Sequence, residues 1–219
     1  WDGFNAILGG GYAGGRIVEL RGGPSSGKTS VSLCAAYEAQ KNNGLVGFID
    51  ASHSFDRNYA QKLGCELDEI LVHSPKYGEE ALEMANILAE GPDVSLIILD
   101  SIAGIVPIAE LLGNISDVRV GHTARLLAQA IRTLAIQCAK SGTTVLLLNE
   151  EKSGRGATTS MHENLFRTFC AQRIELEQVK VVKNRHKTVG NTIRAKVVRN
   201  LLAPPDVSCD IDLLYAEYQ

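Results

Sequence analysis

The chain has 219 residues, of which 45% are hydrophobic, and its formal net charge at pH 7 is −3. This length is enough for one large α/β domain with its own core, and the composition is ordinary for a globular protein. This slight excess of acidic over basic residues argues against a generally basic nucleic-acid-binding protein, although it is compatible with a local basic face.

The cysteines and the apolar runs narrow the class of protein further. Five cysteines are scattered along the chain without any C-x-x-C spacing, so we expect reduced thiols rather than a zinc site or a disulfide framework. The longest apolar stretch, residues 94–108, contains Asp100 and Pro107 and is too short and too polar to span a membrane. We therefore expect a cytoplasmic protein with no membrane partner.

Short apolar runs alternate with helical stretches over the first two thirds of the chain. The run at residues 96–99 is almost continuously apolar, which is typical of a strand with both faces buried. Alternation of strands and helices predicts a mainly parallel sheet that is flanked by helices. The expected strands span residues 16–20, 45–50, 69–73, 94–100 and 143–149, and the expected helices lie near residues 29–41, 56–63, 78–90 and 121–140.

The pattern changes after Asn149. Residues 150–163 carry few apolar side chains, which predicts a mobile loop. Further β runs follow, and residues 184–190 read as the turn of a hairpin between the first two of them. These runs, which we expect to be antiparallel, lie near residues 171–182, 191–199 and 209–216.

A phosphate-binding loop is the strongest local signal. Residues 22–29, GGPSSGKT, fit the pattern G-x-x-x-x-G-K-[ST] between an apolar run and a helical segment. Gly22 and Gly27 let the backbone turn its N–H groups toward phosphate oxygens, and the following helix adds its partial positive charge. Lys28 can pair with the β- and γ-phosphates, and the Thr29 hydroxyl can bind Mg²⁺. The alternative is a chance glycine-rich turn.

Polar side chains end two of the expected strands. Asp100 comes at the carboxyl end of an apolar strand, where a carboxylate can help to hold Mg²⁺ beside the loop or can serve as a helix cap. Asp50 ends another strand and could orient an attacking water or cap the next helix. Tyr59 follows on that helix and could stack on an adenine ring or be an ordinary half-buried aromatic.

Residues 180–199 hold the one concentrated basic region and contain no Asp or Glu. These cations could contact phosphates of DNA or of a neighbour's nucleotide, or the hairpin could simply be solvated. Arg119 and Arg125 flank the start of the long helix and could follow a nucleic-acid backbone. The cations of the hairpin are Lys180, Lys183, Arg185, Lys187, Arg194, Lys196 and Arg199.

Taken together, several segments resemble the RecA recombinases of bacteria over nearly the whole chain. The resemblance implies a RecA-like P-loop NTPase core with antiparallel C-terminal strands, as a single domain over residues 1–219. It also implies that the family's N-terminal packing helix and C-terminal domain are absent from this chain. The segments are GRIVEL at 15–20, the phosphate loop, FIDA at 48–51, YAQKLG at 59–64, GEEALE at 78–83, LDSIA at 99–103 and KVVRN at 196–200.

The resemblance implies that ATP and Mg²⁺ bind at the interface between protomers of a filament. Tyr59 would stack on adenine, Asp56 would lie near its exocyclic amine, and Thr29 and Asp100 would hold the metal. The implied nucleotide contacts are Gly22, Gly23, Pro24, Ser25, Ser26, Gly27, Lys28, Thr29, Ser30, Asp56 and Tyr59.

The same resemblance implies single-stranded DNA as a partner. Two loops, residues 113–121 and 150–163, would face the DNA, and Arg125 would touch its backbone. Lys196 and Arg199 would reach the phosphates of a neighbour's nucleotide. The implied DNA contacts are Arg119, Arg125, Lys152 and Arg155.

Three departures from the family concern hydrolysis. Ser52 stands where the family has a catalytic Glu, and serine cannot accept a proton from water at neutral pH. Loss of a general base typically costs about 10²–10⁴ in rate. Glu150 stands where the family has Gln, and an ionised carboxylate would repel a triphosphate. Leu201 replaces one of two lysines that reach the neighbouring phosphates.

Three hypotheses follow. The first is a DNA-dependent ATPase that coats single-stranded DNA and pairs it with a duplex. The second is a hydrolysis-deficient accessory protein, which would use ATP as a fixed switch and modulate a RecA filament or a lesion-bypass polymerase complex. The third is an ATPase in which Glu150 replaces the missing base. The catalytic candidates of the chain are Lys28, Glu150 and Asp50. The departures favour the second hypothesis.

Overall fold

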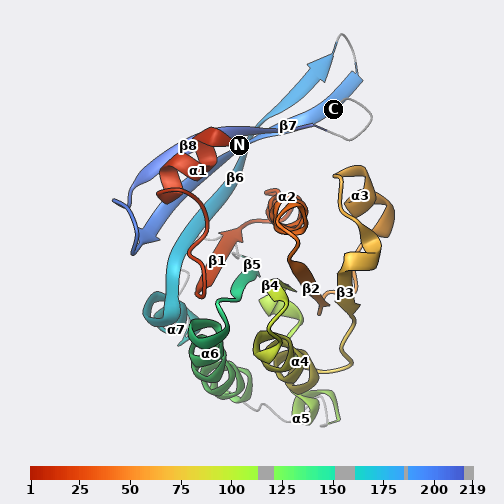
Figure 1. Ribbon diagram of the computed structural model, residues 1–219, viewed down its shortest axis with the longest axis vertical. Helices are drawn as coiled ribbons and strands as arrows, with labels where there is room; N and C mark the ends of the chain where they lie inside the picture. The colour runs from red at the N-terminus through yellow and green to blue at the C-terminus, as the bar shows by residue number, and fades with distance from the viewer. Residues whose placement is uncertain (113–120, 151–160, 185–186, 215–219) are drawn as a thin grey trace.

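The computed structural model of the chain describes residues 1–112, 121–150, 161–184 and 187–214. They form an eight-stranded sheet with the order β3-β2-β4-β5-β1-β6-β7-β8 (Figure 1). Neighbours from β3 to β6 pair in parallel, whereas β7 and β8 pair antiparallel, which confirms the expected α/β architecture. The strands are β1 (Ile17–Gly22), β2 (Leu45–Asp50), β3 (Ile70–His73), β4 (Val94–Asp100), β5 (Thr144–Glu150), β6 (Cys170–Asn184), β7 (Lys187–Asn200) and β8 (Val207–Leu214).

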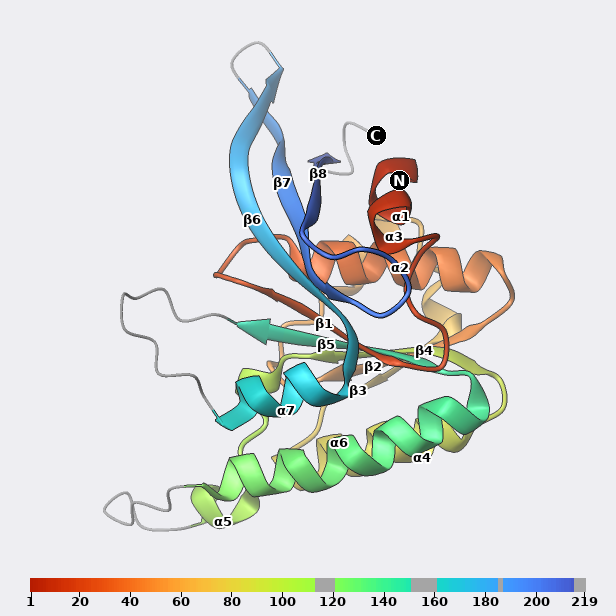
Figure 2. The same cartoon turned by 90° about the vertical axis from the view of Figure 1, so that its left-hand side faces the viewer.

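Helices cover both faces of the sheet (Figure 2). Helices α1 to α3 pack on one face, and α4, α6 and α7 pack on the other. No helix among the described residues is both long and apolar enough to cross a membrane. The helices are α1 (Asp2–Leu8), α2 (Lys28–Lys41), α3 (Arg57–Lys62), α4 (Gly78–Glu90), α5 (Ile108–Leu111), α6 (His122–Ser141) and α7 (Met161–Phe169), with short 3₁₀ turns at Leu67–Glu69 and Ile102–Gly104.

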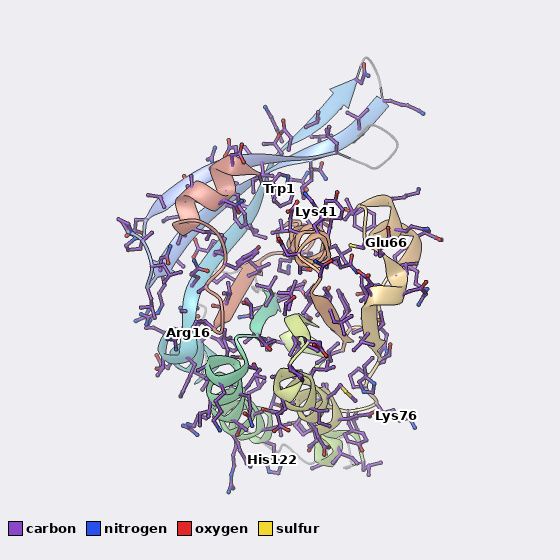
Figure 3. The ribbon with its side chains drawn as sticks, viewed as in Figure 1. Trp1, Arg16, Lys41, Glu66, Lys76 and His122 are labelled. Carbon is purple, nitrogen blue, oxygen red and sulfur yellow. The ribbon has the colours of Figure 1, made fainter. Side chains whose placement is uncertain are left out.

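The two cores explain why the strands look continuously apolar. In β5, Val145 and Leu147 belong to the core beneath α4, α6 and α7, whereas Leu146 and Leu148 belong to the core beneath α1 to α3. Successive side chains of a strand point to opposite faces, so a strand with helices on both sides needs an apolar residue at every position. Side chains fill the space on both sides of the sheet in this way (Figure 3).

Helix α6 follows its sequence pattern closely. The predicted apolar face is buried, because Leu127, Ile131, Leu134 and Cys138 are each at most 1% exposed. The helix ends at Ser141, and the next residue, Gly142, has a φ of 83° and donates its N–H to the carbonyl of Cys138. A glycine in this left-handed conformation is a common helix terminator.

The sequence prediction was wrong in the region after β5. Residues 150–163 were expected to be a loop, but Glu150 is the last residue of β5, and residues 161–163 open α7. The remaining positions, 151–160, lie outside the described residues. Helix α7 is stabilised by Phe166, which is fully buried in the core beneath α4 and α6. The local composition did not predict this helix because its first turn is mostly polar.

The sequence correctly predicted the two strands of the hairpin, but the predicted turn was too long. Residues 184–190 were expected to form the turn, yet Asn184 pairs with Lys187 and Val182 pairs with Gly190. The ladder therefore includes most of the expected turn. Strands β6 and β7 extend away from the helical layers (Figures 1 and 2). Helices α1 and α5 are short and were also not predicted.

A buried network of charges joins β1, β5, β6 and α7. Glu19 in β1 is fully buried and is the ladder partner of Arg173 in β6. The Nε of Arg173 donates to Glu19 at 2.5 Å, and Asn149 donates its amide to the other oxygen of Glu19 at 2.7 Å. The remaining guanidinium nitrogens of Arg173 donate to both oxygens of Glu163, each at 2.8 Å. Polar groups this deeply buried are stabilising only because each has a partner.

Arg21 completes the network from the other side. It is the ladder partner of Glu175 and forms an ion pair with it, and it also lies 3.4 Å from Glu163. The carboxylate of Glu163 therefore contacts two guanidinium groups, those of Arg173 and Arg21. The hydrogen bonds from Arg173, helped by the charges of Arg173 and Arg21, lower the pKa of Glu163 below its ordinary value.

The lowered pKa makes the contribution of Glu163 dependent on pH. A carboxylate with a depressed folded-state pKa stabilises above its unfolded pKa of about 4.3, and this stabilisation is lost as the pH falls through the folded-state pKa. We expect Glu163→Gln to lower the free energy of unfolding at pH 7 by about 1.5–3 kcal/mol, because charged hydrogen bonds are lost. The deficit should shrink as the pH falls below about 4.

Denaturant unfolding followed by circular dichroism measures the free energy of unfolding of the parent and of Glu163→Gln, at pH 7 and at a pH below about 4. Glu83→Gln, an exposed carboxylate on α4, is the matched control and should change stability by less than about 0.5 kcal/mol. An equal deficit at both pH values would show that Glu163 does not act through its charge.

Candidate nucleotide-binding site

The phosphate loop connects β1 to α2 and depends on two glycines. A Cβ atom at Gly22 would lie 2.3 Å from the carbonyl oxygen of Leu176 and 2.6 Å from the hydroxyl of Ser26, so no larger residue fits there. Gly27 has a φ of 90°, which side chains other than glycine rarely adopt. The loop residues Gly23, Pro24 and the positions up to Gly27 thus form a tight turn that ends at the first residue of α2.

Lys28 begins α2 and folds back over the loop. Its Nζ donates to the carbonyl oxygens of Gly22 and Gly23, each at 2.8 Å, and lies 3.5 Å from Ser26. The ammonium group is therefore held at the loop, on the side where the strand ends. An ammonium at this position can form charge-assisted hydrogen bonds with a phosphate group.

Thr29 and Asp100 meet beside the loop, as the pattern indicates for a magnesium site. The Thr29 hydroxyl donates to Oδ2 of Asp100 at 2.7 Å, although the two residues are 71 positions apart. Burial raises the pKa of Asp100, the hydrogen bond from Thr29 opposes this, and the nearby charges of Asp50 and Glu150 raise it further. A cation at this edge would relieve that repulsion.

These residues fit Mg²⁺ as a partner of phosphate rather than as an ion in an all-protein cage. No group of three or more His, Cys, Asp or Glu side chains that could hold a metal is found in the described part of the chain. Mg²⁺ commonly binds through one or two carboxylates, waters and substrate phosphates. The pair of Thr29 and Asp100 next to the phosphate loop matches that requirement.

Asp50 and Ser52 lie at the same edge with their polar groups engaged. The two carboxylate oxygens of Asp50 accept from the backbone N–H groups of Ser54 and Phe55, at 2.8 and 3.0 Å. Asp50 therefore holds the loop before α3, whereas the cap of that helix is Asp56. The hydroxyl of Ser52 lies 2.7 Å from that of Ser54 and 3.3 Å from the carbonyl oxygen of Asp100.

The predicted base-binding residues lie beside the loop on α2 and α3. The hydroxyl of Tyr59 is 2.7 Å from that of Ser30. Asp56 caps α3 by accepting from the backbone N–H of Tyr59 at 3.0 Å. The structure thus brings Ser30 and Tyr59 together at the loop, while Asp56 lies at the start of the helix that carries Tyr59.

Sequence reasoning missed the far wall of this site. A pocket of about 200 Å³ is lined by residues 25–30 and Tyr59, together with Asn191, Ile193 and Leu213 from β7 and β8. No local pattern marks those three residues as nucleotide contacts, because only the antiparallel extension brings them over the loop. A larger groove of about 880 Å³ is lined by residues of α1, α2 and β8 and shares Tyr59 and Leu213 with this pocket.

The remaining predicted residues are those assigned to DNA and to the protomer interface. Arg119, Lys152 and Arg155 lie outside the described residues, and Arg125 is exposed in the first turn of α6. Lys196 and Arg199, on β7, do not line the loop pocket.

The basic hairpin is partly neutralised by β8. Arg194 pairs with Asp210 at 2.8 Å, and Nε of Arg199 donates to the carbonyl of Cys170 at 3.0 Å. Residues 180–199 contain no acidic residue, so only the fold reveals the carboxylates that face Arg194, which belong to its ladder partners Asp210 in β8 and Glu177 in β6. Leu201, directly after β7, is 63% exposed.

Comparisons with known proteins agree with this geometry. Residues 3–218 match the family model described as the RecA N-terminal domain. The chain is 40% identical to the RecA protein of Leptospira meyeri over 212 residues, which cover 94% of this chain and 55% of that protein. It is 41% identical to the RecA protein of Nitrobacter winogradskyi over 221 residues, covering 98% of this chain and 61% of that protein.

A solved structure shows the same fold. The crystal structure of the RadB recombinase superposes with a TM-score of 0.73 at 19% sequence identity, covering 97% of this chain and 94% of that one. The chain spans only 55% and 61% of the length of the two RecA relatives. On the family model and the sequence identity, this chain belongs to the RecA family, as a representative of the RecA N-terminal domain.

Proposed function

We propose that this chain binds ATP with Mg²⁺ and acts on single-stranded DNA in homologous recombination and DNA repair. The observation that carries the proposal is the hydrogen bond between Thr29 and Asp100 beside a phosphate loop. It supplies the hydroxyl and the carboxylate that a nucleotide-bound Mg²⁺ uses in P-loop proteins. Family membership supports the link to recombination and repair.

Each part of the site has a role in this proposal. The backbone N–H groups of residues 22–27 bind phosphate oxygens, and Lys28 neutralises their charge. Tyr59 stacks on the base, while Asp56 can accept a hydrogen bond from an exocyclic amine. Ile193 and Leu213 supply apolar lining to the pocket that also contains Tyr59.

We further propose that copies of the chain associate in a filament with the nucleotide between them. Lys196 is exposed on β7 and would reach the phosphates of the neighbouring copy. Arg199 is half-buried and would add a second charge there. Leu201 brings an apolar side chain to the position where the resemblance implies a lysine.

A second candidate function is favoured by the surroundings of Ser52. Its hydroxyl contacts Ser54 and the Asp100 carbonyl, and the carboxylate of Asp50, which ends β2, accepts two backbone N–H groups. Neither residue is arranged as a general base. The chain would then be a hydrolysis-deficient accessory protein that modulates a RecA filament or a lesion-bypass polymerase complex.

Lys28→Ala tests the phosphate site. Removing the ammonium should weaken Mg·ATP binding by about 10-fold or more, since hydrogen bonds to charged groups contribute roughly 1.5–3 kcal/mol. Titration calorimetry with Mg·ATP measures the affinity. Lys41→Ala, at the other end of α2, is the control and should bind like the parent. Equal affinity of Lys28→Ala and the parent would refute the placement of the site.

Glu150→Gln tests whether this carboxylate replaces the missing base. Glu150 is exposed at the end of β5, on the edge that also carries Asp100. If it activates water, the substitution should reduce any ATP turnover by about 10²–10⁴-fold, with Mg·ATP binding retained. Glu69→Gln, remote from the loop, is the control. Full turnover in Glu150→Gln would exclude the relocated base.

Salt dependence tests the DNA contact of the basic hairpin. Lys180 and Lys183 are exposed on β6. Replacing both by Ala should weaken single-stranded DNA binding and reduce the slope of log K against log salt concentration. Each lost phosphate contact should reduce the slope by about 0.7. Fluorescence anisotropy with a labelled oligonucleotide measures the slope, and Lys140→Ala is the control. An affinity for DNA that does not change from low to moderate salt would contradict an electrostatic contact.

A further inference from the structure

The groove of about 880 Å³ beside the nucleotide pocket has the size of a ligand site of its own. Its walls come from α1, α2 and β8, and α1 lies next to both of the others (Figures 1 and 2). Between these walls the groove reaches Leu96 and Thr144 in the sheet. Sites for small organic molecules typically have volumes of about 300–1,000 Å³ and are lined mainly by apolar and aromatic side chains.

Aromatic rings line much of this groove. Trp1, Phe4 and Tyr12 form a row in which neighbouring rings meet edge to face, with centroids 6.1 and 5.8 Å apart. Tyr37 adds a ring from α2, and Tyr59 adds one from α3. Trp1 is 46% exposed and Tyr37 is 36% exposed, so these two rings are accessible to a ligand. The faces of aromatic rings are electron-rich and attract cations.

The charged side chains that line the groove are all acidic in the part of the chain that the structure describes. Each wall supplies one of them, namely Asp2, Glu38 and Asp212, and no Lys, Arg or His lines the groove. Lys41 lies close by, with its Nζ 5.3 Å from the ring centroid of Tyr37 and 3.4 Å from Glu38. The protein thus already places one ammonium group between an aromatic face and a carboxylate. Anionic ligands would be repelled by these carboxylates.

Tyr12 adds an unsatisfied polar group to the groove. Its hydroxyl is buried and has no hydrogen-bond partner among the described residues. Burial raises the pKa of Tyr12 well above its ordinary value, so the hydroxyl stays a neutral donor. A buried donor without a partner is unfavourable. A ligand that carries a hydrogen-bond acceptor would supply the missing partner.

We propose that this groove binds a small organic cation with an aromatic body, an arylalkyl ammonium compound. Its ammonium group would lie against the ring faces and the carboxylates, and its aromatic body would pack in the row that contains Phe4. The groove shares Tyr59 and Leu213 with the nucleotide pocket, so the same ligand would change the affinity for Mg·ATP. Only this coupling rests on the proposed binding of ATP, and it is reciprocal.

Two probes with similar aromatic bodies and opposite charges test the site on the full chain without nucleotide. Tyramine, a cation, should bind saturably and about 10-fold or more tighter than the anion 4-hydroxyphenylacetate in titration calorimetry. Trp1 is the only tryptophan of the chain and lines the groove. Its fluorescence should therefore change over the same range of tyramine concentration, which locates the binding.

Two variants with matched controls test the lining. Tyr37→Leu removes an aromatic face and Glu38→Gln removes a carboxylate, so each should weaken tyramine binding by about 3-fold or more. Tyr77→Leu and Glu83→Gln replace residues that do not line the groove and should bind tyramine like the parent. Equal affinity of the parent for the two probes, or unchanged tyramine binding in both groove variants, would overturn the site.

Two further measurements separate the alternatives. If tyramine binding is lost as the protein self-associates in sedimentation velocity, a second copy of the chain covers the groove and the proposed site is wrong. Repeating the titration with saturating Mg·ATP should change the tyramine affinity by about 5-fold or more. An unchanged affinity in a parent that binds Mg·ATP would overturn the coupling. Tyramine binding in a parent that does not bind Mg·ATP would overturn the proposed function and leave the groove site standing.

Discussion

The pairing of Glu19 with Arg173 fixes the junction on which the rest of the molecule depends. The two residues are ladder partners in β1 and β6, and the next pair on the same face, Arg21 and Glu175, is also of opposite charge. A slip of one residue would send these charges to the opposite, apolar face of the sheet, so the alternative registers are strongly disfavoured. Removing one member of such a buried pair typically costs about 3–5 kcal/mol.

The register of β6 then determines the walls of the nucleotide pocket. Strands β7 and β8 follow β6 in an antiparallel extension, and they carry Ile193 and Leu213 over the phosphate loop. A Cβ atom at Gly27 would lie 2.8 Å from Leu213, which shows how closely the extension approaches the loop. The pocket is therefore built from the phosphate loop after β1 and from β7 and β8. Its shape depends on the charged junction between β1 and β6.

The parallel half of the sheet was predictable because its signals are local. Strands β2 and β4 have the predicted bounds, since each is an apolar run that ends in Asp. The approach of Thr29 to Asp100 could also be expected, because parallel strands beside a phosphate loop bring their carboxyl ends to one edge. Placing a site at this edge requires only the strand order and the position of the loop.

The remaining features depend on contacts that no local pattern reveals. Helix α7 opens with a polar turn and is stabilised by Phe166 in a distant core, so its composition resembled a loop. Arg194 seemed to be part of a purely basic hairpin, but β8 places Asp210 against it. Glu163 is joined to Arg21 across 142 positions of sequence. Such long-range partners become visible only when the strand order and register are known.

The most direct test of this account is the Mg²⁺ dependence of ATP binding in the parent and in Asp100→Asn. Calorimetry with ATP, performed with Mg²⁺ and with a chelator, measures how much the metal adds to the affinity of each protein. If Thr29 and Asp100 hold a nucleotide-bound Mg²⁺, the metal should tighten ATP binding in the parent, and Asp100→Asn should lose most of that gain. An equal gain from Mg²⁺ in both proteins, or none in the parent, would contradict the assignment of this edge as the metal site.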